Sequence, residues 1–204
     1  MLLPAMFVTF EGLDGSGKTT QVELLRQLLE EEGRTVVTTR EPGGTKLGEE
    51  VREVLLHGDK EIVPWAEAAL FAAARSQLVE EVIAPALESG YDVLCDRYID
   101  SSLAYQGIAR GVGVDRVLEL NLQATRGLLP DRTVLLLVDL EESRARTGET
   151  RDRIEREDDG FVARLDRAYR ELAELFPRRI LAVDGSQDPT QLARMIRGQL
   201  RDIS

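Results

Sequence analysis

The chain has 204 residues, of which 43% are hydrophobic and 31% are charged, and its formal net charge at pH 7 is −11. This length and balance predict a single soluble domain over residues 1–204, and the acidic charge disfavours binding to a nucleic acid polymer or an anionic membrane surface. No apolar run is long enough to span a bilayer, and the single cysteine, Cys95, excludes an internal disulfide, which favours a cytoplasmic protein.

Apolar, β-branched segments alternate with helical patterns along the chain, without repeats or an interdomain linker. This alternation predicts an α/β fold with a parallel sheet covered by helices on both sides. The predicted strands are Met6–Phe10, Thr35–Thr39, Asp92–Cys95, Thr133–Val138 and Ile180–Val183.

Six helical patterns separate or follow these strands. The second is a short helix, and the third contains Pro85, which predicts a kink or a broken last turn. Capping residues indicate the helix ends. The first predicted helix ends at Gly33, the second is a short helix through Leu56, and the third is a long helix over Pro64–Leu87. The fourth covers Asp115–Thr125, the fifth begins at Asp158 or Asp159, and the last has Asp188 at its N-cap.

A phosphate-binding loop, or P-loop, follows the first strand. Its residues fit the motif G-x-x-x-x-G-K-[ST] between a predicted strand and a predicted helix, which is the context that the motif requires. The helix N-terminus favours negative charge, Lys18 can reach the β- and γ-phosphates, and the Thr19 hydroxyl can ligate Mg²⁺. The loop residues predicted to bind the nucleotide are Gly12, Leu13, Asp14, Gly15, Ser16, Gly17, Lys18, Thr19 and Thr20.

Two charged residues, Asp96 and Arg97, follow the third strand. A carboxylate at this position next to a P-loop is suited to contact Mg²⁺ through water, although a helix N-cap or a structural ion pair would use the same residue. Arg97 can bind phosphate oxygens with two parallel hydrogen bonds, which indicates a second phosphate near the P-loop, whereas the ordinary alternative is a surface ion pair.

An arginine-rich segment covers residues 143–157, with acidic residues between five arginines. Two interpretations stay open for it. It is either a solvated helix with surface ion pairs or a mobile lid whose arginines close over phosphates.

Three motifs together carry a family resemblance. They are the P-loop from Phe10 to Thr20, the turn Arg40-Glu41-Pro42-Gly43-Gly44-Thr45, and Asp96-Arg97-Tyr98 followed by Ser101-Ser102-Leu103-Ala104-Tyr105-Gln106. The segments Asp152–Glu155 and Asp184-Gly185 agree with them. With these motifs the chain resembles bacterial thymidylate kinases, members of the P-loop nucleoside monophosphate kinases, from about Phe7 to the last helix.

The resemblance implies transfer of the γ-phosphoryl group of ATP to thymidine 5′-monophosphate (dTMP), which gives ADP and dTDP for dTTP biosynthesis. It also implies Mg²⁺, a cytoplasmic location and a homodimer. The fold implied is a three-layer P-loop domain with a five-stranded parallel sheet and a short arginine-rich lid.

Site residues are implied by the same resemblance. Phe71 would stack on the thymine ring, and Arg75, Ser102 and Gln106 would contact the base edge. Arg52 and Arg97 would hold the phosphate of dTMP. Asp14 would bind near the sugar 3′-hydroxyl and the acceptor site, and Tyr105 would pack beside C2′ of the sugar and disfavour ribonucleotides. Glu41 would help to hold the metal–water cluster and the acceptor phosphate. The P-loop lacks an arginine, so the implied catalytic cations are Arg151 and Arg153 of the lid, with Lys18 and Arg97.

Two other functions share some of these features. A kinase for another nucleoside monophosphate or a deoxynucleoside would have the same P-loop and lid and a different acceptor pocket. A P-loop nucleotide switch would bind a protein partner instead of a small acceptor, and Arg97 and the arginine-rich segment argue against it.

Overall fold

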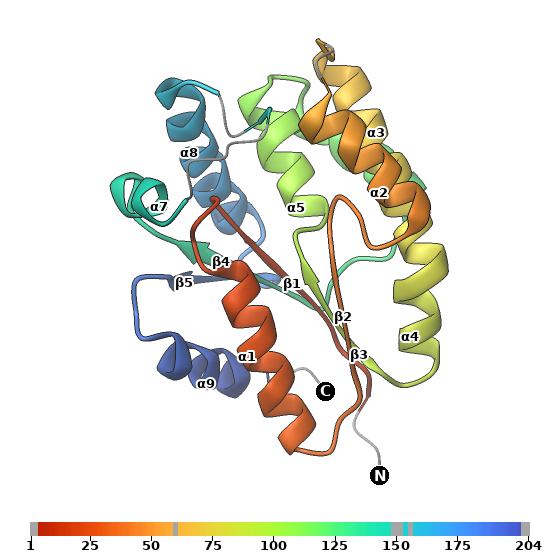
Figure 1. The fold of residues 1–204 in the computed structure, drawn as a ribbon, viewed down its shortest axis with the longest axis vertical. Helices are drawn as coiled ribbons and strands as arrows, with labels where there is room; N and C mark the ends of the chain where they lie inside the picture. The colour runs from red at the N-terminus through yellow and green to blue at the C-terminus, as the bar shows by residue number, and fades with distance from the viewer. Residues whose placement is uncertain (1–3, 59–60, 148–152, 155–156, 201–204) are drawn as a thin grey trace.

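The computed structural model describes residues 4–58, 61–147, 153–154 and 157–200, and these contain one five-stranded parallel sheet (Figure 1). The strand order is β2-β3-β1-β4-β5, so the strand that leads into the P-loop lies in the centre. The strands are β1 (Phe7–Gly12), β2 (Val36–Arg40), β3 (Asp92–Asp96), β4 (Arg132–Leu137) and β5 (Ile180–Asp184). The predicted parallel sheet is confirmed, and each strand lies within two residues of its predicted limits.

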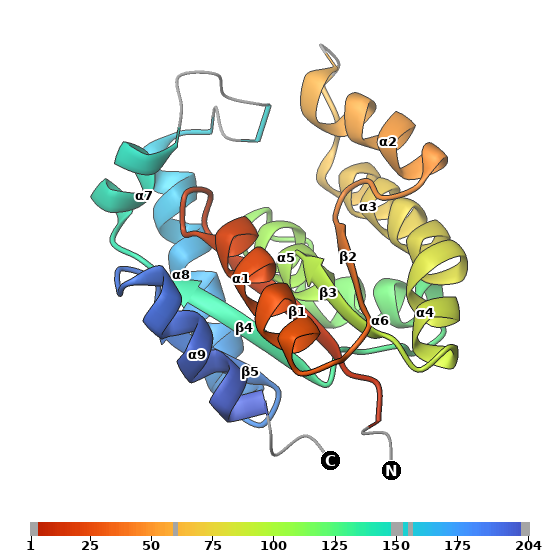
Figure 2. The ribbon, with the colours of Figure 1, turned by 60° about the horizontal axis from the view of Figure 1, so that its bottom comes forward.

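Alternate residues of the central strand face different halves of the core. Val8 and Phe10 pack with apolar residues of α1 (Lys18–Glu31) and α9 (Pro189–Leu200), which lie on one face of the sheet (Figure 2). Phe7 belongs to a second cluster on the opposite face. This period of two explains why β1 is buried along its whole length.

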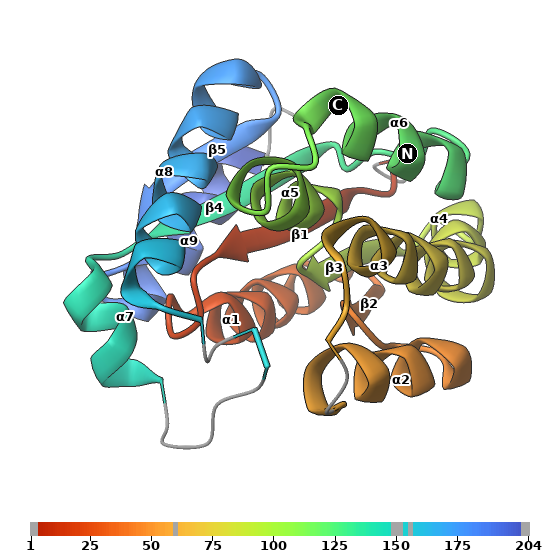
Figure 3. The same cartoon turned by 90° about the horizontal axis from the view of Figure 1, so that it is seen from above.

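The second face is covered by a larger group of helices, so the described chain forms three layers (Figure 3). A sheet between two helical layers is the architecture that the alternating pattern predicts. The helices that contribute to this side are α3 (Pro64–Leu78), α4 (Ala84–Glu88), α5 (Ile99–Ser102), α6 (Val114–Ala124) and α8 (Asp159–Leu175), while α2 (Lys46–Arg52) packs on α3 and α7 (Leu140–Arg146) follows β4.

Wider, π-helical turns interrupt or extend several helices. The segment η1 (Glu53–His57) extends α2, η2 (Val79–Ile83) joins α3 to α4, and η3 (Leu103–Ala109) extends α5. The long helix begins at Pro64 as predicted, and its irregular turn immediately precedes Pro85, which has no N–H to continue the regular hydrogen bonds.

The helix ends follow the capping residues of the sequence. The Asp158 Oδ1 atom accepts a 2.7 Å hydrogen bond from the Phe161 N–H, and Asp188 Oδ1 accepts one of 2.9 Å from the Gln191 N–H. Gly33 follows α1 with a φ of 80°. The helix predicted to begin at Asp115 begins one residue earlier, at Val114. None of the helices in the described ranges has both the length and the apolar character needed to cross a membrane.

Candidate functional site

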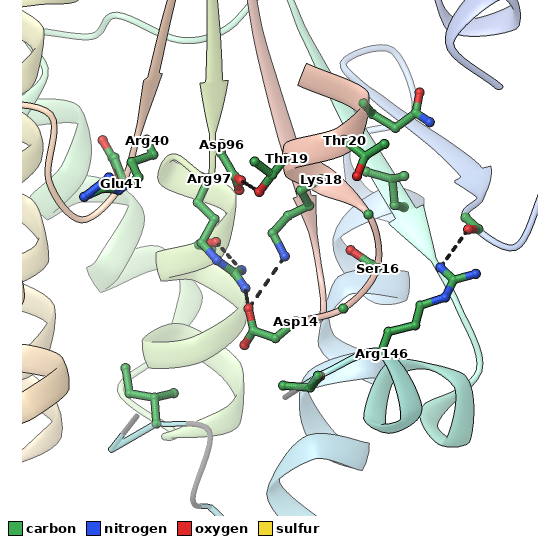
Figure 4. Close-up of a pocket in the computed structure, with 18 of the residues that line it drawn as sticks. Asp14, Ser16, Lys18, Thr19, Thr20, Arg40, Glu41, Asp96, Arg97 and Arg146 are labelled. Atoms are coloured by element: carbon green, nitrogen blue, oxygen red, sulfur yellow. Dashed lines mark hydrogen bonds and ion pairs between the residues drawn. The ribbon is translucent and has the colours of Figure 1, made fainter. Parts of the chain in front are cut away.

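A cleft of about 820 Å³ opens where the P-loop follows β1 (Figure 4). One wall comes from the P-loop, α1 and the segment between β5 and α9, and the other comes from the end of β2, α2, α3 and η3. The predicted residues that line the cleft are Asp14, Gly15, Ser16, Gly17, Lys18, Thr19, Thr20, Glu41, Arg52, Phe71, Asp96, Arg97, Ser102, Tyr105 and Gln106. The cleft therefore brings the P-loop and most predicted acceptor residues into one space.

The P-loop glycines adopt backbone angles in a region that residues with a side chain rarely adopt. The φ angles of Gly12, Gly15 and Gly17 are 138°, 75° and 96°. A Cβ atom at Gly12 would collide with the Leu136 carbonyl oxygen, and one at Gly15 would collide with the Ser143 carbonyl oxygen of α7. The tip of the loop is therefore packed directly against α7.

Lys18 is held inside the P-loop by the loop's own carbonyl groups. Its Nζ atom donates to the carbonyl oxygens of Leu13 at 2.8 Å and Gly12 at 3.2 Å. Burial and the nearby Arg97 lower the pKa of Lys18, and Asp14 opposes that shift. The ammonium group is thus fixed at the loop, with its charge close to the position where a phosphate would enter.

Thr19 and Asp96 meet as the P-loop and the end of β3 predict. The Thr19 hydroxyl donates a 2.7 Å hydrogen bond to Asp96 Oδ2 (Figure 4). Asp96 does not cap the helix that follows, because the N-cap of α5 is Tyr98. Two hard oxygen donors suit Mg²⁺, which takes one or two protein ligands and completes its shell with water and phosphate oxygens. The described residues hold no cluster of three or more His, Cys, Asp or Glu that would make a separate metal cage.

Arg97 is joined to the P-loop by its guanidinium group. Its Nη2 atom lies 2.5 Å from Asp14 Oδ1, and its Nη1 atom donates to the Gly12 carbonyl oxygen at 3.1 Å. Burial alone would raise the pKa of Asp14, but Arg97 and Lys18 outweigh it and hold that pKa at about 2. The backbone of Arg97 has a φ of 69°, a strained value for a residue with a side chain.

Glu11 is a buried carboxylate behind this ion pair. Its Oε1 atom accepts hydrogen bonds from the backbone N–H groups of Tyr98 at 2.8 Å and Ser101 at 3.0 Å. Its Oε2 atom accepts hydrogen bonds from the hydroxyl groups of Ser101 at 2.6 Å and Tyr169 at 3.1 Å. Burial, with a smaller contribution from Asp100, raises the pKa of Glu11 to about 7. The same Ser101 and Tyr169 hydroxyls accept hydrogen bonds from Arg97. Glu11 therefore holds in place two hydroxyl groups that position the Arg97 guanidinium.

The opposite wall carries an aromatic and amide surface. Phe71 of α3 and Tyr105 of η3 both line the cleft, and the Tyr105 ring packs near the rings of Phe161 and Tyr169. Gln106 lines the same wall with 1% of its surface exposed. An apolar wall with a few fixed polar groups is typical of a site for a planar organic ligand.

Arg75 is fully buried and does not line the cleft. Its guanidinium forms an ion pair with Glu41 and donates to Ser102 Oγ and to the Tyr98 carbonyl oxygen, both at 3.0 Å. Burial raises the pKa of Glu41, although Arg75 opposes the shift. Among the described residues, Glu41 Oε1 finds no hydrogen-bond partner. Arg75 therefore positions two residues, Glu41 and Ser102, that do line the cleft.

The predicted lid is only partly described. Arg151 lies outside the described residues. Arg153 does not line the cleft, because its Nε atom donates to the Leu55 carbonyl oxygen at 2.7 Å and its Nη2 atom pairs with Glu67. Arg146, at the end of α7, does line the cleft and donates to the Gly185 carbonyl oxygen at 3.2 Å (Figure 4).

The family model for thymidylate kinases matches residues 10–196 of the chain. The chain belongs to the thymidylate kinase family. Among its relatives, the thymidylate kinase of Pelotomaculum thermopropionicum is 52% identical over 185 residues, which are 89% of this chain and 86% of that protein. The thymidylate kinase of Bifidobacterium longum strain NCC 2705 is 48% identical over 203 residues, which are 98% of each chain.

A solved structure agrees with this family assignment. The crystal structure of thymidylate kinase from Ehrlichia chaffeensis superposes with a TM-score of 0.78 at 33% sequence identity, over 97% of this chain and 99% of that one. The thymidylate kinase fold therefore extends over nearly the whole molecule, and the motifs that carry the resemblance in sequence all lie in that shared region.

Some residues of this thymidylate kinase site were not predicted. Glu11 is a lone carboxylate in an apolar strand, and this position in the sequence could have indicated a buried polar network. Tyr169 and Glu67 gave no such signal, because their partners are far away in the sequence. The cleft wall opposite the acceptor side was predicted only in part, because Arg146 and Thr147 belong to the predicted lid segment 143–157. Its residues that were not predicted to line the site are Gln21, Leu136, Gly185, Ser186, Gln187, Asp188, Pro189 and Leu192.

Proposed function

We propose that this protein is an ATP-dependent dTMP kinase, which transfers the γ-phosphoryl group of ATP to dTMP and releases ADP and dTDP, a step of dTTP biosynthesis. The observation that carries the proposal is that one continuous cleft joins the P-loop to the wall of Phe71, Tyr105 and Gln106. Membership of the thymidylate kinase family supports the same reaction.

The donor site is assigned to the P-loop and the wall beside it. Backbone N–H groups of residues 12–20 and the N-terminus of α1 suit the phosphates of ATP. Lys18 would contact the β- and γ-phosphates from its fixed position in the loop. Gln21, Arg146 and the segment 185–189 line the space beyond the loop, where the nucleoside of ATP would lie.

Mg²⁺ is part of the proposal: the Thr19 hydroxyl would ligate it, and the Asp96 and Glu41 carboxylates would contact it through water. When bound, Mg²⁺ neutralises charge on the β- and γ-phosphates. The Thr19 hydroxyl and the Asp96 carboxylate are already adjacent, at 2.7 Å. The unpartnered Oε1 atom of Glu41 supports its part, because a buried carboxylate oxygen next to a cleft is suited to accept a hydrogen bond from water.

The acceptor site is assigned to the opposite wall. Phe71 would stack on the thymine ring, Gln106 and Ser102 would contact the base edge, and Tyr105 would pack against the sugar at C2′. Arg75 would act on the base edge through Ser102, to which it is hydrogen-bonded. The acceptor phosphate and sugar would be held by Arg52, Arg97 and Asp14.

Transfer requires positioning more than acid–base catalysis. The acceptor phosphate is an anionic nucleophile near neutral pH, so the main task is to hold two anions in line. Arg97 lies beside the P-loop, where it can attract the acceptor phosphate toward the donor. The residues thus provide direct in-line transfer without a phosphorylated enzyme.

Cationic charge from the lid completes the proposed mechanism. Arg151 and Arg153 are the proposed lid cations, because the P-loop has no arginine. Arg153 is engaged by Glu67 and Leu55, so its participation requires that these contacts break when the lid closes.

We further propose that the enzyme is cytoplasmic and forms a homodimer. The single, buried Cys95 suits a reducing compartment. The homodimer is supported by the resemblance to thymidylate kinases. Light scattering at micromolar concentration tests it, and a mass of one chain at all concentrations would overturn it.

The reaction is tested by ADP release from ATP and Mg²⁺ with a panel of acceptors. These are the monophosphates of thymidine, deoxyuridine, deoxycytidine, uridine, cytidine, adenosine and guanosine, together with free thymidine. We expect rapid turnover with dTMP and slow turnover with the rest. Turnover with a different acceptor would keep the donor site and overturn the base contacts. Tight nucleotide binding without any acceptor-dependent release would favour a nucleotide switch.

A further inference from the structure

Glu67 is a buried acidic residue that lies behind the proposed base site. It belongs to α3, four residues before Phe71, and 1% of its surface is exposed. Its Oε1 atom accepts a 2.9 Å hydrogen bond from Nε2 of Gln106, which lies on the neighbouring η3. Figure 3 shows α3 beside the helix that continues from α5. Glu67 thus contacts a residue of the cleft wall without lining the cleft itself.

This contact determines which way the Gln106 amide faces. An ionised carboxylate can only accept hydrogen bonds, so the amide must turn its NH₂ group toward Glu67. The carbonyl oxygen Oε1 then lies on the other edge of the amide. Without a partner of fixed polarity, a glutamine could present either group to a ligand.

Two arginines keep the carboxylate in place. Arg153 pairs with Oε2 of Glu67, and Arg110 Nε donates to Oε1 at 3.4 Å. Arg110 also pairs with Glu157 at 2.7 Å and lies over the Phe161 ring, with 4.7 Å from its Cζ atom to the ring centroid. The buried charge of Glu67 is therefore compensated by two arginines, and Arg110 lies outside the proposed lid, so its contact does not have to break when the lid closes.

We propose that Glu67 is a positioning residue for base selection, which fixes the Gln106 amide so that its acceptor oxygen serves a base with an N–H donor. This inference rests on the proposed function. Thymine carries a hydrogen on N3 and can donate to Gln106 Oε1, whereas N3 of cytosine is an acceptor and would face another acceptor. A site built around one buried hydrogen bond rejects a ligand that cannot make it much more strongly than a site built on shape.

A purely structural role for Glu67 makes a different prediction. If Glu67 only anchors the arginine-rich segment through Arg153, its loss would lower turnover with every acceptor by a similar factor. A positioning role changes the ratio between acceptors. The ratio of kcat/KM for dTMP to kcat/KM for deoxycytidine monophosphate (dCMP) therefore separates the two roles.

The experiment starts with the wild-type enzyme and then uses Glu67→Gln. Wild-type turnover of dTMP is measured first, and its absence would overturn the proposed function together with this inference. A glutamine at position 67 can donate or accept, so Gln106 can then rotate to suit cytosine. We expect the dTMP-to-dCMP ratio to fall by about tenfold or more in Glu67→Gln. A ratio within about twofold of the wild-type value, even with lower overall activity, would overturn the inference.

Two further variants make the test specific. The double variant Glu67→Gln with Gln106→Glu exchanges donor and acceptor, so a carboxylate oxygen again faces the base, and its ratio should favour dTMP as in the wild type. Arg110→Gln removes a partner of Glu67 and leaves Gln106 in contact with it, so its ratio should stay unchanged. If Glu67→Gln does not fold in thermal melting, the double variant decides, because a preference for dCMP in it would overturn the inference.

Discussion

The Arg97 guanidinium lies 2.5 Å from the Asp14 carboxylate, so the residue after β3 and the P-loop after β1 form one charged unit. These residues are 83 positions apart in the sequence, and the adjacent parallel strands bring them together. Asp14 keeps Arg97 pointing at the loop, and Arg97 keeps Asp14 ionised. An acceptor phosphate bound by Arg97, as proposed, would lie next to the phosphates of a donor in the P-loop.

We expect Asp14→Asn to weaken dTMP binding more than ATP binding. The pKa of Asp14 is about 2, so its charge is present at every pH used for assays, and the amide removes it. The KM for dTMP should rise by about tenfold, the value of one charge-assisted hydrogen bond, with a smaller change in the KM for ATP. Steady-state kinetics at pH 7.5 measure both, and an equal rise in the two constants would contradict the assignment of Asp14 to the acceptor side.

Lys18→Ala should abolish most activity and leave the fold intact. Lys18 would neutralise charge on the transferred group, and the loss of one such preorganised donor lowers kcat by about 10²- to 10³-fold. Single-turnover transfer from ATP to dTMP measures the effect. Circular dichroism with thermal melting checks the fold, because Nζ also bonds two loop carbonyl groups. A folded variant with near wild-type turnover would overturn the donor site.

Glu11→Gln should change how stability depends on pH. The pKa of Glu11 is raised by burial from 4.5 to about 7 in the folded protein, so the folded state binds this proton more tightly than the unfolded state. The contribution of Glu11 to the free energy of unfolding is therefore greatest below pH 4.5 and decreases as the pH rises toward 7. Glutamine has no such proton. The stability of Glu11→Gln relative to wild type should increase by about 3 kcal/mol between pH 4.5 and 7.5.

Urea unfolding at several pH values measures this difference. Glu174→Gln, at an exposed glutamate of α8, is the matched control. The interpretation of Glu11 fails if both variants show the same pH dependence relative to wild type.

Tyr105 should determine selection against a 2′-hydroxyl group by the bulk of its ring. Tyr105→Phe keeps the ring, so the ratio of kcat/KM for dTMP to that for its ribose analogue should stay within about twofold of wild type. Tyr105→Leu opens space at C2′, and the ratio should fall by about tenfold. Competition between the two acceptors measures the ratio. An unchanged ratio in folded Tyr105→Leu would remove Tyr105 from this role.

The parts of the site made by neighbouring residues could be predicted from the sequence. The P-loop is one continuous segment, and its glycines, lysine and threonine keep their relative positions whatever the rest of the fold does. The strands were predicted for a similar reason, since buried parallel strands consist of short continuous apolar runs. To predict that Thr19 and Asp96 lie close together, it was enough to know also that β1 and β3 end at the same edge of the sheet.

The parts made by long-range packing could not be predicted from the residues alone. Tyr169 contacts Glu11 across 158 positions, and nothing in the helix pattern of α8 distinguishes it from an ordinary core tyrosine. Arg75 is the opposite case, because a charged residue is rarely expected to have 1% of its surface exposed. Its partner Glu41 follows a different strand, so only the fold reveals the ion pair that allows its burial.

The contact between Gly15 and α7 has a consequence for the evolution of this site. A side chain at position 15 would collide with the Ser143 carbonyl oxygen and crowd Thr147. A cationic side chain could therefore not be placed at position 15 by a single substitution while α7 remains where it is. If the proposed lid cation were replaced by one at position 15, α7 would have to change as well, so the two arrangements would be separated by more than one substitution.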